Sequence, residues 1–143
     1  MEEFMQRYKF YGDYRLRFAF AKKFAGRLRK YKDWMIIPIP VSKERFFLRG
    51  FNQVEGLLLA SNIRFCLALT KPYDRAYQSH KTREERLQEK QPFLLMEKRM
   101  NELYRKKILL VDDIYTTGRT LFHAYDALKK VWPKKVRTFT LAR

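Results

Sequence analysis

Two adjacent acids and the small hydroxyl residues that follow them are the part of this sequence best suited to chemistry. Asp112 and Asp113 precede a loop that contains Thr116, Thr117, Gly118 and Thr120. Paired carboxylates accept hydrogen bonds from the vicinal hydroxyls of a sugar, or hold Mg²⁺ through water. The loop offers hydroxyl and backbone N–H donors to a phosphate. Together these groups indicate a ribose 5-phosphate site; the alternative is a solvated acidic turn before an ordinary helix.

An aliphatic strand and an amphipathic helix must position these groups. Residues 108–111 form a continuous aliphatic run, typical of a strand in a parallel sheet that is covered on both faces. Because buried unpaired carboxylates are costly, the acids should emerge at the carboxyl end of that strand, where α/β sheets bind ligands. Apolar residues then recur at helical spacing, namely Leu121, Phe122, Ala124, Tyr125, Leu128, Val131 and Trp132. The order strand, loop, helix predicts an α/β fold.

A second strand is predicted over residues 34–40, and a basic loop follows it. This loop contains Ser42, Lys43, Arg45 and Arg49 and leads into a helix that begins at Asn52. The Asn52 side chain can cap this helix, and Glu55 can complete a capping box. Since the loop follows the neighbouring strand, its cations can bind a second anion beside the first. The alternative for each arginine is an ordinary surface charge.

Residues 111–120 resemble, without a gap, the phosphoribosyl pyrophosphate (PRPP) motif of the type I phosphoribosyltransferases. The resemblance implies a single-domain α/β fold over residues 1–143, with a parallel sheet flanked by helices and a mobile lid loop. In that family the two acids bind the ribose hydroxyls, with Mg²⁺ held indirectly, and the loop after the neighbouring strand binds pyrophosphate, here Ser42, Lys43, Arg45 and Arg49. The 5-phosphate loop would be Tyr115, Thr116, Thr117, Gly118, Arg119 and Thr120.

The lid implied by the family falls at about residues 75–91, after a predicted short strand over residues 65–69. The segment is polar and basic, with little apolar surface to bury, so that it can close over a polyphosphate when its cations find partners. The candidate lid residues are Gln78, Lys81, Arg83 and Arg86. A plain exposed helix is the alternative.

Three further stretches resemble one branch of this family, the ComF competence proteins. They are residues 8–13, 49–53 and 78–87. This resemblance implies a protein that binds PRPP or a related ligand with Mg²⁺, handles single-stranded DNA during natural transformation, and acts beside a ComFA-like helicase. ComF proteins typically begin with a four-cysteine zinc-binding segment. This chain has only Cys66, so we expect that it lacks this N-terminal zinc-binding segment, as a truncated product would.

Charge is the strongest compositional signal. The formal net charge of +17 on 143 residues implies a polyanionic partner or a strongly anionic ligand. Residues 14–31 predict one helix with a core stripe of Leu16, Phe20, Phe24, Leu28 and Tyr31, and no acid occurs between residues 14 and 32. Its opposite side carries candidate contacts to DNA phosphates, namely Lys22, Lys23, Arg27 and Lys30. A solvated basic face is the alternative.

The numbers of cysteine and histidine residues also restrict the expected cellular compartment and the metal sites that the chain could form. One cysteine, expected in the core, excludes an internal disulfide and favours a reducing compartment, so a cytoplasmic location is expected. No apolar run is long enough for a membrane span. His80 and His123 offer no zinc-site spacing, and His123 is predicted on a helix surface. A last strand is predicted over residues 135–142.

Three functions remain open from the sequence. The first is a ComF-like protein that binds a phosphoribosyl ligand and single-stranded DNA. The second is a phosphoribosyltransferase of nucleotide salvage, in which a base attacks the anomeric carbon; catalytic activity and the acceptor are not readable from the residues. The third is a regulator that senses PRPP and binds RNA or operator DNA through its basic face.

Overall fold

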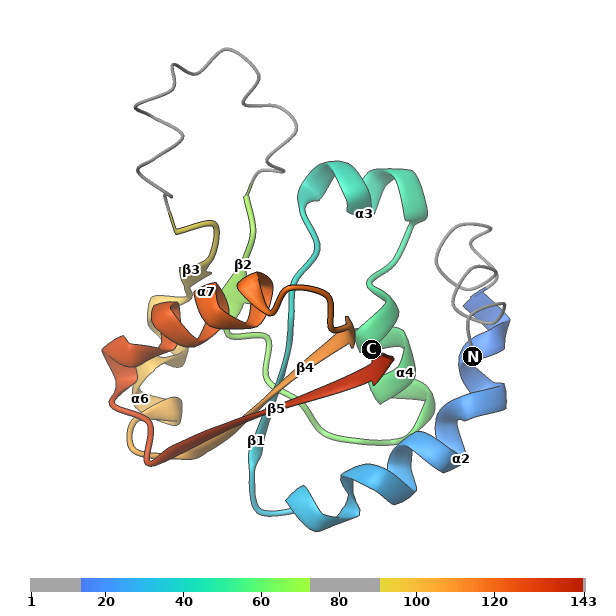
Figure 1. The fold of residues 1–143 in the computed structure, drawn as a ribbon, viewed down its shortest axis with the longest axis horizontal. Helices are drawn as coiled ribbons and strands as arrows, with labels where there is room; N and C mark the ends of the chain where they lie inside the picture. The colour runs from blue at the N-terminus through green and yellow to red at the C-terminus, as the bar shows by residue number, and fades with distance from the viewer. Residues whose placement is uncertain (1–13, 73–90, 143) are drawn as a thin grey trace.

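A three-stranded parallel sheet forms the centre of the protein. The structure, a computed structural model, describes residues 14–72 and 91–142. Strands β1 (Met35–Pro38), β4 (Lys107–Ile114) and β5 (Lys135–Ala142) lie in the order β1-β4-β5, and both pairs are parallel (Figure 1). The aliphatic run at residues 108–111 therefore occupies the central strand. The predicted α/β fold with a parallel sheet and flanking helices is confirmed, and β5 has the predicted bounds.

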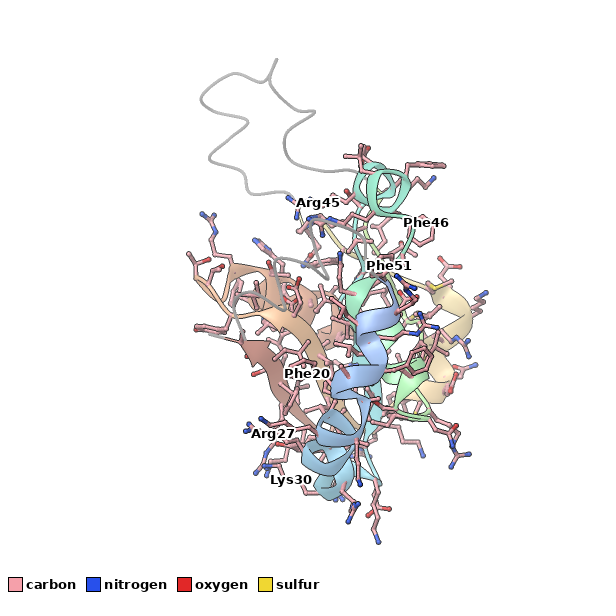
Figure 2. All side chains as sticks on the ribbon, turned by 90° about the vertical axis from the view of Figure 1, so that its right-hand side faces the viewer. Phe20, Arg27, Lys30, Arg45, Phe46 and Phe51 are labelled. Atoms are coloured by element: carbon pink, nitrogen blue, oxygen red, sulfur yellow. The ribbon has the colours of Figure 1, made fainter. Side chains whose placement is uncertain are left out.

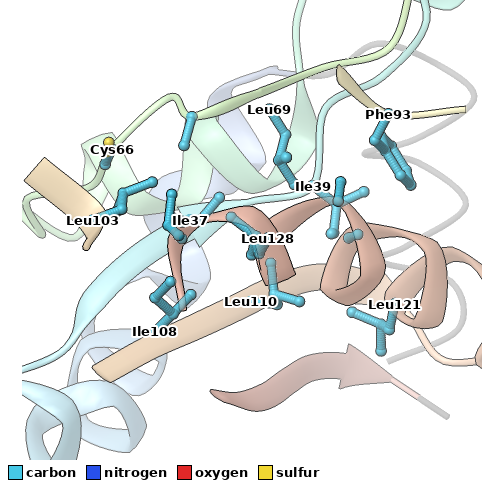
Figure 3. Close-up of a cluster of buried hydrophobic side chains, with 14 residues drawn as sticks. Ile37, Ile39, Cys66, Leu69, Phe93, Leu103, Ile108, Leu110, Leu121 and Leu128 are labelled. Atoms are coloured by element: carbon cyan, nitrogen blue, oxygen red, sulfur yellow. The ribbon is translucent and has the colours of Figure 1, made fainter. Parts of the chain in front are cut away.

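Successive side chains of β4 serve two cores because side chains alternate between the faces of a strand. Leu109 and Val111 pack with Ile36 on one face, whereas Ile108 and Leu110 pack with Ile37 on the other (Figure 3). All four β4 residues are fully buried. A strand buried on both faces explains why the sequence shows a continuous aliphatic run here.

Two helices cover the first face. The predicted helix over residues 14–31 consists of η1 (Tyr14–Leu16), α2 (Arg17–Leu28) and η2 (Arg29–Tyr31). It packs beside α4 (Gln53–Ala60), and the Ser61 hydroxyl donates to the Ala21 carbonyl over 3.0 Å. Of the predicted stripe, Phe24, Leu28 and Tyr31 are buried, and Leu16 and Phe20 pack at its edge. The stripe is confirmed.

The second face is covered by α7 (Arg119–Leu128), η5 (Lys129–Val131), η4 (Glu97–Arg99) and α6 (Met100–Leu103). Part of the predicted α7 stripe is wrong. Phe122, Tyr125 and Trp132 are 62%, 40% and 74% exposed. The side chains of α7 that pack towards the sheet are instead those of Leu121, Ala124, Ala127 and Leu128. An apolar residue at near-helical spacing can thus lie outside the buried face.

Two smaller predictions are also wrong. His123 was expected at the surface but is only 7% exposed, since the segment that leads into β3 (Leu94–Leu95) contacts α7 and Gln91 donates to the His123 carbonyl over 2.8 Å. Of the strand predicted over residues 65–69, only Leu69 lies in a strand, and residues 65–68 are irregular. One bond, from Cys66 N–H to the Ile36 carbonyl, joins them to β1, and β2 (Leu69–Thr70) pairs antiparallel with β3.

Cys66 lies in the core, as predicted, and is 4% exposed. Burial raises the pKa of its thiol, and the negative charge of Glu102 raises it further. A buried thiol with a raised pKa reacts slowly, which fits a packing role. No helix within the described ranges is both long and apolar enough to cross a membrane.

Candidate functional site

The two acids lie at the carboxyl end of β4, inside the strand rather than after it. Asp112 pairs with Thr140 and Ile114 with Ala142, so β5 extends the strand beyond its predicted end. On the other side β1 ends at Pro38, opposite Val111, with one more bond from Ile39 N–H to the Val111 carbonyl. Within residues 14–72 and 91–142, the acids therefore have a strand neighbour only on the β5 side.

Backbone amides orient both carboxylates. Asp112 Oδ1 accepts from the Asp113 N–H over 2.8 Å, and Asp113 Oδ1 accepts from the Ile114 N–H over 2.7 Å. Both side chains are half-buried. The arrangement places two carboxylates on adjacent residues at the sheet's carboxyl edge, where α/β sheets bind ligands and where carboxylates can accept hydrogen bonds from hydroxyls.

The loop between β4 and α7 is shaped around one glycine. Gly118 has φ +75°, a left-handed conformation, and a Cβ at this position would come within 2.8 Å of the Tyr115 hydroxyl oxygen. Tyr115 N–H donates to the Ala142 carbonyl over 2.9 Å, which attaches the loop to the end of β5. A glycine is required here because any side chain would be strained by the backbone and would displace the tyrosine ring.

The threonines of the loop face solvent at the start of α7. Thr116, Thr117 and Thr120 are exposed, and the Thr117 hydroxyl oxygen accepts from the Arg119 N–H over 3.4 Å. Gly118 is the N-cap residue and has no side chain that could cap the helix. The first turn of a ten-residue helix thus presents hydroxyls and its positive dipole end on the same edge as the two acids.

The loop predicted after β1 is wrong in part, because residues 43–49 form a short helix, α3 (Lys43–Arg49). Ser42 starts it by accepting from the Arg45 N–H over 3.3 Å, and Gly50, at φ +77°, ends it by donating to the Phe46 carbonyl. Ser42 is fully buried in this capping role, whereas Lys43 and Arg45 are exposed and Arg49 is half-buried.

The helix α3 stands at the same end of the sheet as the loop between β4 and α7 (Figure 1). Figure 2 shows Arg45 and Phe46 on opposite sides of α3, with Arg45 on the side where β4 and β5 lie. The structure thus brings the predicted acids, the threonine loop and the α3 cations to one edge of the sheet.

Residues 49–53, one of the stretches that resemble the ComF proteins, form a structural corner at the start of α4. Asn52 Oδ1 accepts from the N–H groups of Val54 and Glu55, so the predicted cap is confirmed. The Asn52 amide donates to the Ile39 carbonyl and to Glu55 Oε1, each over 3.0 Å. This buried side chain therefore fixes the start of α4 to the end of β1.

Glu55 completes this corner with a bond to the side chain of Asn52 rather than to its backbone. Burial raises the pKa of the Glu55 carboxyl, and the hydrogen bond from Asn52 offsets part of that rise. Its position in the first turn of α4 makes it a cap element rather than a ligand group.

The two carboxylates fit a Mg²⁺ ion that is bound jointly by the protein and by a phosphate-bearing ligand. No group of three or more His, Cys, Asp or Glu side chains that suits a metal occurs among the described residues. Mg²⁺ is commonly held by one or two carboxylates together with water and substrate phosphates, and Asp112 and Asp113 meet that requirement.

The remaining predicted residues belong to the lid and to the first helix. The lid residues Gln78, Lys81, Arg83 and Arg86 lie outside the described residues, and only Gln91, at the end of the predicted lid, is placed, with its amide bound to α7. Lys22, Lys23 and Arg27 are exposed on α2, and Lys30 is exposed on η2. Figure 2 shows Arg27 and Lys30 near the end of α2 that leads into β1.

Comparisons with known proteins agree with this geometry. The family described as Phosphoribosyl transferase domain matches residues 54–143. Competence protein ComFC of Streptococcus pneumoniae (strain ATCC BAA-255 / R6) is 43% identical over the whole chain, which covers 63% of that protein. Competence protein ComFC of Bacillus subtilis (strain 168) is 36% identical, again over the whole chain and 60% of that protein. The chain thus spans less than two thirds of the length of these relatives.

Among solved structures, a hypoxanthine phosphoribosyltransferase from Staphylococcus aureus aligns with a TM-score of 0.49 at 13% identity, over 89% of this chain and 63% of that one. The expected resemblance to ComF competence proteins is confirmed by the two relatives. The match over residues 54–143 includes the acids and the whole threonine loop. The chain belongs to the phosphoribosyltransferase domain family.

Proposed function

We propose that this chain binds PRPP or a related phosphoribosyl ligand together with Mg²⁺ at the carboxyl edge of its sheet, and that it also binds single-stranded DNA in a competence pathway. The observation that carries the first part is the meeting of Asp112 and Asp113 with the Gly118 loop at the end of the central strand. Carboxylates beside backbone N–H and hydroxyl donors suit a ligand that carries both sugar hydroxyls and a phosphate.

Each part of the crevice has a role in this proposal. The carboxylates of Asp112 and Asp113 accept hydrogen bonds from the ribose hydroxyls. Thr116, Thr117 and Thr120, with the first N–H groups of α7, bind the 5-phosphate. Lys43, Arg45 and Arg49 on α3 neutralise pyrophosphate, while Ser42 holds that helix in place through its cap. Bound Mg²⁺ would neutralise charge on the pyrophosphate oxygens.

The DNA part of the proposal rests on charge and on the named relatives. Two relatives that match the whole chain are called competence proteins, and the chain carries a net charge of +17. Lys22, Lys23 and Arg27 stand exposed on α2, and Lys30 stands exposed on η2. A helicase of the ComFA kind is the partner that such a protein would act beside.

Calorimetric titration of PRPP with Mg²⁺ tests the crevice. Asp113→Asn combined with Thr117→Ala should weaken PRPP binding by tenfold or more, since it removes a charged acceptor and a loop hydroxyl (roughly 1.4 kcal/mol per factor of ten). Asp33→Asn removes the same charge from an exposed acid just before β1 and should leave the affinity unchanged. Unchanged affinity in the double variant would refute the assignment.

Turnover is tested separately, because a binding motif can persist without chemistry. Pyrophosphate release would be followed while a panel of nucleobases is offered with PRPP and Mg²⁺. Release with one base would identify a nucleotide-salvage transferase. PRPP binding without release from any base would identify a binding protein.

A further inference from the structure

A basic and aromatic groove lies at the amino edge of the sheet, at the other end of β4 from the acids. We call it the amino-edge groove; it has a volume of about 1190 Å³. Its lining comes from the segments just before β4 and β5 and from the end of α7 with η5. Figure 1 shows these segments at the end of the sheet where β4 and β5 begin. Its lining residues are Tyr104, Arg105, Tyr125, Lys129, Lys130, Trp132, Pro133 and Lys134. A second hollow shares three of them and continues to Lys135 and Thr138 on β5.

The aromatic rings of this groove are exposed instead of packed. Trp132 is 74% exposed, Tyr104 55% and Tyr125 40%. Together in one groove, these rings present flat apolar faces on which a ligand can stack. The core beneath them is filled by smaller side chains, including Leu103, Leu128 and Val131.

The backbone directs two of these side chains outward at a conformational cost. Trp132 has φ +47° and Arg105 has φ +54°, although neither is a glycine. The strained positions are held by bonds from Arg105 N–H to the Val131 carbonyl and from Lys134 N–H to the Lys106 carbonyl. Left-handed residues that carry side chains persist where the surrounding structure enforces them, and they concentrate at functional sites.

The charge of the groove has one sign. Its lining contains Arg105 and three lysines but no acid. The neighbouring Asp126 is bound to Lys129 over 3.0 Å, and the pKa of its carboxyl is lowered chiefly by that lysine. Arg105, Lys130 and Lys134 form no ion pair with any residue that the structure describes. These three cations are therefore available to an anionic partner.

We infer that the amino-edge groove binds single-stranded DNA, with unpaired bases stacked on Trp132, Tyr104 and Tyr125 and phosphates held by Arg105, Lys130 and Lys134. This inference rests on the proposed DNA function and adds a second surface to the α2 face. Flat rings interleaved with cations suit a single strand, because stacking requires bases that are not already paired. Binding to an anionic membrane, which an exposed tryptophan with neighbouring cations also suits, is the other outcome that the test below separates from DNA binding.

The groove and the crevice are far enough apart to be filled together. β4 has eight residues, and at roughly 3.3 Å per residue its start lies about 20 Å from Asp113. No residue lines both sites. PRPP and DNA binding should consequently be separable by mutation.

Anisotropy titration of a labelled oligothymidine of about 16 nucleotides tests the inference at fixed low salt. Trp132→Ala should weaken binding about tenfold, the loss expected for one stacked base. Trp132→Phe keeps a ring and should bind within about threefold of the wild type. Phe122→Ala is the matched control, because Phe122 is 62% exposed on α7 but does not line the groove.

Equal oligothymidine affinity for wild type and Trp132→Ala would overturn the inference, as would equal losses in the Phe122 and Trp132 alanine variants. Binding to anionic vesicles that depends on Trp132, without a matching effect on oligothymidine, would also overturn it. PRPP titration of Trp132→Ala should match the wild type. Failure of the wild type to bind PRPP would refute the proposed crevice and leave the groove result standing.

Discussion

The ring of Tyr115 covers the α-carbon of Gly118, so closely that a Cβ at position 118 would lie 2.8 Å from the tyrosine hydroxyl. Gly118 also has φ +75°, so two independent requirements exclude a side chain at the start of α7. The shape of the proposed phosphate loop depends on this pair.

Gly118→Ala should lower the free energy of unfolding by about 1–2 kcal/mol, because a side chain in the left-handed region is strained. It should also weaken PRPP binding, since Tyr115 and the loop must move. Urea unfolding and calorimetry measure the two effects. Gly26→Ala is the control: Gly26 lies in α2 with open space around its α-carbon, and this change should stabilise the protein by up to about 1 kcal/mol. If Gly118→Ala changed neither the free energy of unfolding nor the PRPP affinity, the close contact between Tyr115 and Gly118 would be contradicted.

Asn52→Ala should destabilise the protein by about 2 kcal/mol, because it removes the cap of α4 and leaves the buried Ile39 carbonyl without its donor. Urea unfolding with an unchanged slope would measure this loss. Asn101→Ala, at an exposed position in α6, should change stability by less than about 0.5 kcal/mol. Similar small effects for both variants would show that the corner contributes little.

Lys23→Glu with Arg27→Glu should weaken single-stranded DNA binding and reduce the slope of log affinity against log salt by about 1.4, at roughly 0.7 per lost phosphate contact. Both side chains are exposed on α2. Titrations over a salt series would measure the effect. Lys98→Glu on η4 is the control, because it reverses a charge that lies outside the α2 face. An unaltered slope would remove α2 from the DNA surface, and a strong preference for one sequence would favour the regulator.

Glu55→Gln should make the stability of the α4 corner less dependent on pH. Burial raises the pKa of Glu55 in the folded state, so the folded protein binds more protons than the unfolded chain between the two pKa values. The wild type should accordingly gain stability relative to Glu55→Gln as the pH falls through the raised pKa towards the ordinary glutamate range. Urea unfolding at neutral and mildly acidic pH measures this difference. A difference that stays constant with pH would contradict the shift.

Local sequence determined several features fully. The Asn52 cap, the core stripe of α2 and the strand over residues 135–142 each follow from residue types at fixed spacing, and each appears as predicted. The order of strand, acids, threonine loop and helix also follows from the sequence alone. These features depend on interactions between residues close in the chain, or on the requirement that one face be buried.

Tertiary contacts decided the rest. β4 extends through Asp112 and Asp113 because β5 supplies Thr140 and Ala142 as pairing partners. A local sequence pattern does not predict pairing between segments that are this far apart in the chain. His123 is buried because the segment from Gln91, at the end of the predicted lid, to β3 packs on α7. Trp132 is exposed because its backbone adopts a left-handed conformation after η5, whereas its apolar character alone predicted burial. Spacing shows which residues share a face of an element, but only the packed structure decides which face is covered.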